Sequence, residues 1–197
     1  MNSQMLFALA GFALVSSITP GPNNLMLMAS GANYGFRRTL PHMLGVSLGF
    51  SFMILVVGGG LVRVFAAAPV TLVILKTVSV VYLVYLAWKI ATAGKPDDGG
   101  PMGKPFTFIQ AALFQWVNPK AWAMALTAVS VYTTFGRWSE VLTIAVFFCA
   151  INLPCVSSWA LAGQTARRWL SVGQRLRWFN LSMATLLIAS LYPLLAR

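Results

Sequence analysis

Acidic residues are nearly absent from this chain of 197 residues, which has three aspartates and glutamates against fourteen lysines and arginines. Charged residues make up 9% of the sequence and hydrophobic residues 58%, whereas about 25% of the residues in a typical soluble domain are charged. This composition favours a protein whose solvent is the lipid bilayer. The net charge of +11 does not indicate nucleic-acid binding, because the basic residues are spread between apolar segments. We therefore expect the bilayer, and no nucleic acid, as a partner.

Cysteine and histidine are also scarce. Cys149 and Cys155 lie six residues apart in one apolar segment, where they would point in different directions on a helix and would not form a local disulfide. His42 is the only histidine, and no ordinary metal site can be assembled around it inside apolar segments. An enzyme or a membrane-embedded redox protein would need a nucleophile with a base, a metal cluster or suitably paired cysteines. We therefore predict no catalytic residues, no metal and no cofactor, and a protein that is not an enzyme.

Long apolar runs are what the sequence has in abundance. A transmembrane helix needs about 20 predominantly apolar residues. Six segments reach this length: 5–30, 40–62, 68–90, 108–132, 140–162 and 177–196. The first segment has no basic residue before it and continues into a proline-rich stretch, so we interpret it as a span and not as a signal peptide. The sequence thus predicts an all-α integral membrane protein with about six transmembrane helices.

A linker rich in glycine, proline and charge, residues 94–105, divides this single membrane domain into residues 1–93 and residues 106–197. Three spans in each half would give the two halves opposite orientations, which is the inverted-repeat arrangement of many transporters. Nine lysines and arginines lie at the first, third and fifth loops, against three on the other side. The positive-inside rule therefore places these three loops in the cytoplasm and both termini outside, unless the first segment enters the membrane and returns.

Two of the predicted spans are interrupted by proline. The first span contains "TPGPNN", residues 19–24, and the fourth contains "WVNPKAW", residues 116–122. Broken helix inside a membrane has to face protein or a water-filled cavity, because each unpaired backbone group costs several kcal/mol in lipid. Paired interruptions in two repeats point to a binding site between them. We therefore predict these substrate-binding residues: Thr19, Pro20, Gly21, Pro22, Asn23, Asn24, Gln115, Asn118, Pro119 and Lys120.

The chemistry of these breaks favours a small zwitterion as the ligand. The half-helix that begins at Pro22 presents its positive dipole end to the break, which suits a carboxylate. Lys120 has no buried acidic residue to pair with, so its partners are a substrate carboxylate or carbonyls freed by Pro119, unless its side chain extends to the interface. A substrate ammonium group would need backbone carbonyls or amide side-chain oxygens as acceptors. A second cation on the substrate would find no counter-charge, which favours a neutral amino acid.

Three further patterns concern helix faces. Four polar residues in the first span are spaced 3, 4 and 7 positions apart: Ser16, Thr19, Asn23 and Ser30. This spacing places them on one face of a helix and predicts a polar stripe that either binds substrate or packs against small residues. Gly45 and Gly49 form a GxxxG motif in the second span, which predicts close packing against another helix. Asn152 and Pro154 indicate a third polar break, in the fifth span, which either lines the pathway or is a packed bend.

The stretches "TPGPNNLMLMASGANYGFRRTLPHMLGVSLG", "VYLVYLAWKIATAG" and "FQWVNPKAWAMALTAVS" resemble, in order, the signatures of the LysE/RhtB family of bacterial amino-acid exporters. The doubled asparagine, "MLGVSLGF", "LAWKIAT" and "SWALAG" are most similar to its cysteine and O-acetylserine exporter branch. The resemblance covers nearly the whole chain. It implies a multi-pass secondary transporter of the bacterial inner membrane that exports a small neutral amino acid, of the cysteine/O-acetylserine or the homoserine/threonine type, by proton antiport.

The chain also departs from this family. Some members carry an aspartate in the second span, where this chain has Phe50 and Ser51. His42 is then a candidate for proton coupling, since histidine titrates near neutral pH when unperturbed; an interfacial histidine without a role is the other interpretation. A non-transporting membrane assembly or channel subunit is the alternative function, and it predicts no saturable efflux. A homo-oligomer is compatible with either function.

Overall fold

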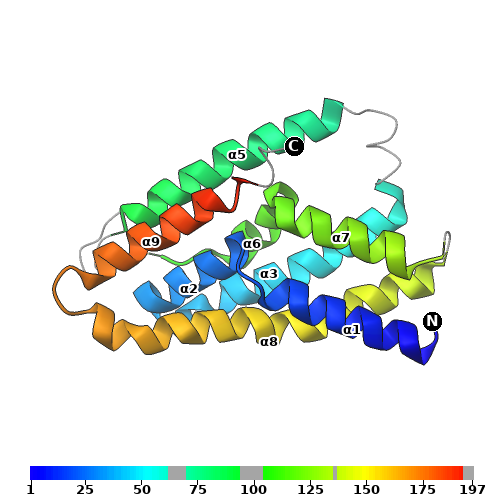
Figure 1. Ribbon diagram of the computed structural model, residues 1–197, viewed down its shortest axis with the longest axis horizontal. Helices are drawn as coiled ribbons and strands as arrows, with labels where there is room; N and C mark the ends of the chain where they lie inside the picture. The colour runs from blue at the N-terminus through cyan, green and yellow to red at the C-terminus, as the bar shows by residue number, and fades with distance from the viewer. Residues whose placement is uncertain (62–69, 94–103, 135–136, 193–197) are drawn as a thin grey trace.

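A computed structural model describes residues 1–61, 70–93, 104–134 and 137–192 (Figure 1). The predicted linker residues 94–103 and the loop residues 62–69 lie outside these ranges. The described residues form helices and no strand, which confirms the predicted all-α fold. The α-helices are α1 (Ser3–Ile18), α2 (Pro22–Tyr34), α3 (Phe36–Val56), α5 (Val70–Ala91), α6 (Phe108–Phe114), α7 (Pro119–Tyr132), α8 (Trp138–Leu170) and α9 (Arg175–Ala189), with a π-helix η1 (Val57–Leu61) and a 3₁₀ turn η2 (Gln115–Val117).

The helix lengths fit a multi-pass membrane protein. Among the described residues, three helices are long and apolar enough to cross a bilayer: α3 with η1, α5 from Val73, and α8. The bent pair α1 and α2 meets the same criteria of length and composition when it is counted as one span, which brings the number to four. The apolar helix Phe108–Val117 is shorter, and α9 has 15 residues. The prediction of six spans in two inverted repeats therefore remains a prediction.

The first interruption separates α1 from α2. Proline disfavours helical conformation in the residue before it and has no N–H to donate, so α1 ends at Ile18 and Thr19 is extended. Pro22 is then the first residue of α2, a position where the missing N–H costs nothing. The helix axis bends by 53° between α1 and α2. Because this bend is less than a right angle, α2 continues away from α1 and does not fold back along it (Figure 1).

The second interruption separates α6 from α7. Thr107 caps α6 in a reciprocal capping box with Gln110, which satisfies two free N–H groups at the helix start. After α6 the chain makes the turn η2, and Asn118 is the N-cap of α7 with Pro119 as its first residue. The predicted fourth helix is thus broken, like the first, and its break is next to Asn118 and Pro119.

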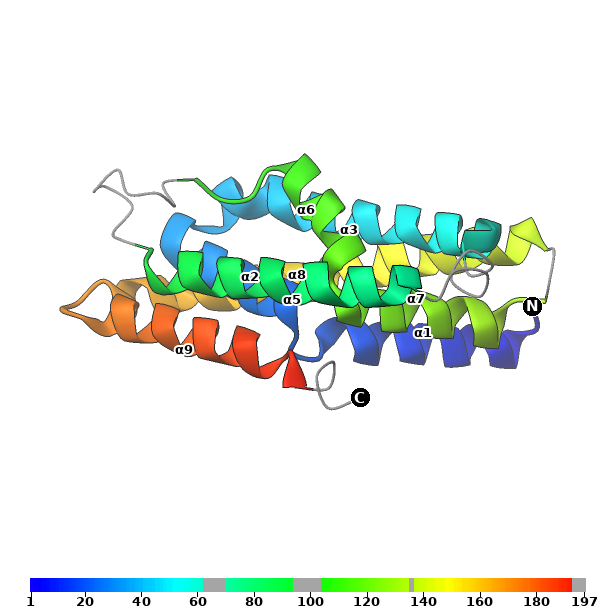
Figure 2. The same ribbon diagram turned by 90° about the horizontal axis from the view of Figure 1, so that it is seen from above.

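The long helix α8 organises the molecule. It runs along the whole length in both views, and α1, α2 and α3 pack against it, while α5 packs against α9 (Figures 1 and 2). Helices α1 and α7 are antiparallel neighbours, because Tyr132 at the end of α7 bonds to the carbonyl of Ala8, whereas Lys120 at its start reaches Thr19. The two interrupted helices therefore meet with their broken ends together.

Small residues allow two of these helix pairs to approach closely. A Cβ atom on Gly45 would come within 2.3 Å of the carbonyl oxygen of Phe108, and one on Gly49 within 2.6 Å of the Cα atom of Ala112. The GxxxG motif thus packs against α6, as predicted. A Cβ on Gly31 would lie 2.0 Å from the carbonyl oxygen of Ala160, so α2 and α8 are in backbone contact.

The charged and apolar surfaces agree with a membrane environment. Basic residues occupy the first turns of α3 and α9 and the last turns of α5 and α8, and these helix ends lie at one end of the molecule (Figure 1). Large apolar side chains along the helices face outward, including Phe7 at 79% exposed and Val81 at 65%. Such surfaces are stable in contact with lipid chains.

Candidate functional site

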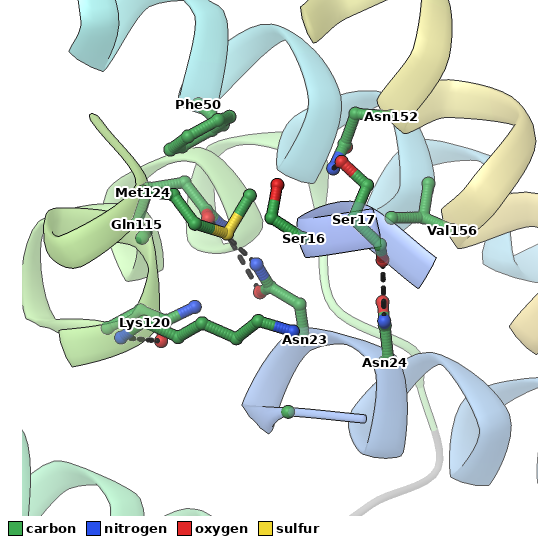
Figure 3. A pocket seen from close by; sticks show the side chains of 13 residues that line it. Ser16, Ser17, Asn23, Asn24, Phe50, Gln115, Lys120, Met124, Asn152 and Val156 are labelled. Atoms are coloured by element: carbon green, nitrogen blue, oxygen red, sulfur yellow. Dashed lines mark hydrogen bonds between the residues drawn. The ribbon is translucent and has the colours of Figure 1, made fainter. Parts of the chain in front are cut away.

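A polar cavity lies where the two interrupted helices meet (Figure 3). Helices α1, α2, α3, α7 and α8 and the turn η2 all contribute to its lining. Its free volume is about 20 Å³, roughly the space that one water molecule needs. The lining residues are Ser16, Ser17, Gly21, Asn23, Asn24, Phe50, Gln115, Asn118, Lys120, Ala121, Met124, Asn152 and Val156.

Most of the predicted binding residues are brought together here. Of the ten, six line the cavity: Gly21, Asn23, Asn24, Gln115, Asn118 and Lys120. Thr19 contacts the Lys120 side chain beside it. The three prolines have a structural part, since Pro20 follows the end of α1 while Pro22 and Pro119 begin α2 and α7.

A reciprocal amide pair joins the two breaks. The Nδ2 group of Asn23 donates to Oε1 of Gln115 at 2.8 Å, and Nε2 of Gln115 donates back to Oδ1 of Asn23 at 3.2 Å (Figure 3). Gln115 also donates to the carbonyl of Ala111. Because both amides are self-complementary, this pair joins α2 to η2 with no charge involved.

Lys120 extends from α7 to the end of α1. Its ammonium donates to the carbonyl of Thr19 at 2.7 Å, the hydroxyl of Thr19 at 2.9 Å and the carbonyl of Pro20 at 3.3 Å. Its carbonyl partners are therefore at the first break, not the carbonyls freed by Pro119 that the sequence suggested. A Cβ atom on Gly21 would lie 2.6 Å from Cδ of Lys120, so only glycine leaves this path open.

The end of α1 is satisfied by side chains of three other helices. An α-helix leaves its last carbonyls without partners, and here Asn24 of α2 donates to the carbonyls of Ser17 and Thr19, each at 2.8 Å. The indole of Trp159 in α8 donates to the carbonyl of Ile18 at 3.0 Å. With Lys120 of α7, these side chains supply donors to four successive carbonyls. The positive ammonium also lies at the negative end of the α1 dipole, where a cation is favoured.

The start of α2 differs from the start of α7. The side chain of Asn118 accepts a bond from the backbone N–H of Lys120 and so caps α7. At α2 the N-cap residue is Gly21, and no side chain caps the helix. The start of α2, where Gly21, Asn23 and Asn24 line the cavity, therefore has no side-chain oxygen as a cap, an arrangement that suits an anionic group.

Asn152 of α8 lines the opposite part of the cavity. Its side chain is 5% exposed, and its Nδ2 group donates to the hydroxyl of Ser17 at 3.1 Å (Figure 3). Its Oδ1 atom has no hydrogen-bond partner within the described ranges.

The predicted third break at Pro154 is wrong, because α8 continues as a helix from Trp138 to Leu170. Pro154 is exposed on its outer side, and Asn152 lines the cavity from unbroken helix.

Other predicted residues lie elsewhere. Ser30 bonds to the hydroxyl of Thr39 and does not line the cavity; the predicted stripe fails because the break between Ile18 and Pro22 changes the helix register. His42 is 1% exposed, packs against the ring of Phe106 at 5.2 Å and is not part of the cavity lining. It is buried within the protein, and neither the proton-coupling role nor the interfacial position without a role is tested by this contact.

The rest of the cavity wall is apolar. Phe50, Met124, Ala121 and Val156 line it together with the amides. Phe50 therefore faces the cavity at the place where the sequence resemblance suggested an aspartate in other members, and the neighbouring Ser51 bonds to the carbonyl of Ser47. Among the described residues that form the lining, none is acidic. Glu140 bonds to the backbone N–H of Thr134, outside this lining. Phe50, Met124 and Val156 were missed by the sequence analysis, since apolar residues in apolar spans give no signal.

A multi-pass helical membrane protein with a polar cavity between two interrupted helices has the architecture of a membrane transporter. Residues 14–190 match the family described as LysE type translocator. The chain is 32% identical over 190 residues to the cysteine/O-acetylserine efflux proteins of Escherichia coli (strain K12), Escherichia coli O139:H28 and Shigella flexneri serotype 5b, covering 95% of this chain and 96% of each relative. No solved structure is significantly similar to it. The chain therefore belongs to the LysE family of translocators, and it is a transporter and not an enzyme.

Proposed function

We propose that this protein exports a small neutral amino acid, of the cysteine/O-acetylserine or homoserine/threonine type, from the bacterial cytoplasm across the inner membrane. Family membership and the names of the three relatives support amino-acid export. The observation that carries the proposal is the pairing of the Lys120 ammonium with the uncapped start of α2 in one cavity. Both groups bind carboxylates, and the lining around them contains no acidic residue.

The carboxylate of the substrate would bind between the start of α2 and Lys120. To do so it replaces the carbonyls of Thr19 and Pro20 as partner of the ammonium. The ammonium already makes charge-assisted bonds to these carbonyls, and a carboxylate adds the attraction of an opposite charge. This attraction favours the exchange, and the flexible lysine side chain allows it.

The cavity also favours a neutral side chain on the substrate. Phe50, Met124 and Val156 provide an apolar wall, and burying apolar surface there stabilises a small uncharged side chain. The second cation of lysine or arginine would have no acidic partner in the lining, and an unpaired charge in such a site is costly.

Transport would proceed by alternating access between two inverted repeats, residues 1–93 and residues 106–197. The elements that the repeat would relate to each other are neighbours: α3 packs against α8, and α5 packs against α9. With free volume for about one water molecule, the cavity is too small for an amino acid in this conformation. Substrate entry then requires the Asn23–Gln115 pair to separate, which moves α2 relative to η2 and so one repeat relative to the other.

Proton antiport would supply the driving force, with His42 as the proton carrier. His42 is the sole histidine and is buried with both ring nitrogens unpartnered among the described residues. A buried group that lacks fixed partners can gain one when neighbouring helices move, so its proton affinity can follow the conformational state.

The test is efflux of radiolabelled cysteine, O-acetylserine, homoserine and lysine from loaded cells that express the wild type, Asn23→Ala or Lys120→Ala at matched membrane levels. Lys89→Ala is the control, because Lys89 lies over the Tyr85 ring on α5, away from the cavity. We expect wild-type efflux of a neutral compound that is lost in both cavity variants and kept in the control. Efflux of lysine alone would contradict the site chemistry, and saturable efflux of none of them would favour the non-transporting alternative.

A further inference from the structure

Two residues in the described part of the chain have buried side-chain atoms without a hydrogen-bond partner. They are His42, through both ring nitrogens, and Asn152, through Oδ1. Of the two, only Asn152 lines the cavity. A buried polar atom without a partner costs about 1–3 kcal/mol, so such atoms are rare unless a ligand or a water molecule completes them.

The Asn152 amide has one hydrogen-bond partner among the described residues. Its Nδ2 group is bonded to the hydroxyl of Ser17 on α1, which leaves Oδ1 as the free end. An amide oxygen can only accept hydrogen bonds. The group that completes it must therefore be a donor.

Most other acceptors around the cavity are already occupied. The carbonyls at the end of α1 accept from Asn24, Trp159 and Lys120. The oxygens of Asn23 and Gln115 accept from each other's amide groups. A donor on a bound ligand can therefore use Asn152 without breaking an existing bond.

We propose that Oδ1 of Asn152 accepts a hydrogen bond from the α-ammonium group of the substrate and makes the site selective for amino acids over carboxylates without an amino group. This inference rests on the proposed function. Figure 3 shows the Asn152 amide and the Lys120 side chain on opposite sides of the cavity, with Ser16 and Asn23 between them. A zwitterion placed between them presents its carboxylate to Lys120 and its ammonium to Asn152.

This placement also explains how a cavity without acidic residues can hold a cation. The ammonium of an amino acid carries its own counter-charge, the carboxylate, so a neutral acceptor is sufficient for it. The same acceptor is insufficient for the terminal ammonium of lysine. Asn152 thus favours a zwitterion with one amino group and one carboxylate.

The experiment measures equilibrium binding to the purified full-length protein in lipid nanodiscs. Two ligand pairs differ only in the α-amino group: cysteine with 3-mercaptopropionate, and homoserine with 4-hydroxybutyrate. The wild type should bind the amino acid of at least one pair more tightly, by about ten- to hundredfold for a hydrogen bond to a charged group. In Asn152→Leu this preference should disappear, because affinity for the amino acid falls while affinity for the deaminated compound is unchanged.

Two further variants separate ligand binding from folding. Leu161→Ala, on the same helix but exposed and outside the lining, should keep the preference of the wild type. Asn152→Asp keeps an acceptor oxygen and should also retain a preference for the amino acid. Asn152→Leu removes the unpartnered Oδ1 but also the bond from Nδ2 to the Ser17 hydroxyl. Because these two effects oppose each other, its unfolding temperature should stay close to that of the wild type, and thermal unfolding of each variant checks this.

The possible failures are distinguishable. A preference for the amino acid that survives in Asn152→Leu overturns the assignment of Asn152 and leaves the proposed function intact. Equal loss of both members of a pair in Asn152→Leu also overturns it, since the residue would then act on the whole site. A wild type that binds none of the four compounds overturns the proposed function together with this inference.

Discussion

Replacing Lys120 with methionine tests whether its ammonium binds the substrate carboxylate. Methionine keeps most of the length of the side chain and removes the charge. The effect on folding should be modest, since the carbonyl of Thr19 retains its bond from Asn24 and the Thr19 hydroxyl retains its bond to Ser16. Of the three bonds that are lost, the one to the Pro20 carbonyl leaves an acceptor without another partner described for it. We therefore expect a loss of about 1–3 kcal/mol in the free energy of unfolding.

The effect on binding should depend on the carboxylate of the ligand. A hydrogen bond between two charged groups contributes about 1.5–3 kcal/mol, which corresponds to about ten- to 150-fold in Kd. Because Lys120 gives up its bonds to the end of α1 when it binds the ligand, we expect a value near tenfold. Cysteamine, which is cysteine without its carboxylate, should bind equally to both proteins.

The assay is competition of each compound against a radiolabelled substrate on purified protein, with thermal unfolding as the check on stability. A tenfold weaker binding of cysteine with unchanged binding of cysteamine would support the carboxylate contact. Equal weakening of both compounds would refute the reasoning, because Lys120 would then act through the fold of the break and not through the carboxylate.

Three other substitutions test separate parts of the structure. Gly21→Ala should reduce transport at least severalfold while the protein still folds, because its Cβ displaces only the flexible side chain of Lys120; efflux at matched membrane levels measures this, and wild-type efflux would contradict it. Gly31→Ala should destabilise the protein by about 1–3 kcal/mol or more by pushing α2 away from the backbone of α8, whereas Gly11→Ala, with nothing within 4 Å of its added Cβ, should be neutral or stabilising; thermal unfolding in detergent compares the two. His42→Gln should uncouple export from the proton gradient, so that an imposed pH gradient no longer accelerates efflux in proteoliposomes; an unchanged response would exclude His42 as the proton carrier.

The positions of the two helix breaks can be predicted from sequence, because they depend on local chemistry. Pro20 and Pro22 have no N–H, and each restricts the residue before it. The same local reasoning failed at Pro154, where α8 continues as a helix. That proline lies on the exposed side of a helix packed along much of its length against other elements, and tertiary packing outweighs the loss of one backbone hydrogen bond.

The partners of the site residues depend on tertiary structure and were only partly predictable. The sequence indicated that Lys120 needs acceptors, but not that they are the carbonyls of Thr19 and Pro20, about 100 residues earlier in the chain. The pairing of Asn23 with Gln115 and the position of Asn152 have the same origin. They follow from the antiparallel packing of α1 against α7 and the contact of α1 with α8, which no spacing within one segment encodes.

The end of α1 connects parts of the chain that are far apart in sequence, since Asn24, Lys120 and Trp159 all donate to its carbonyls. Breaking the Asn24 bond to Ser17 or the Trp159 bond to Ile18 leaves a backbone carbonyl without its side-chain donor in a site with little room for water, which is costly in a membrane. The bonds are therefore most easily exchanged together. If the cavity opens during transport, we expect this opening to be cooperative, so that partly open states, through which ions and metabolites would leak across the membrane, are rarely populated.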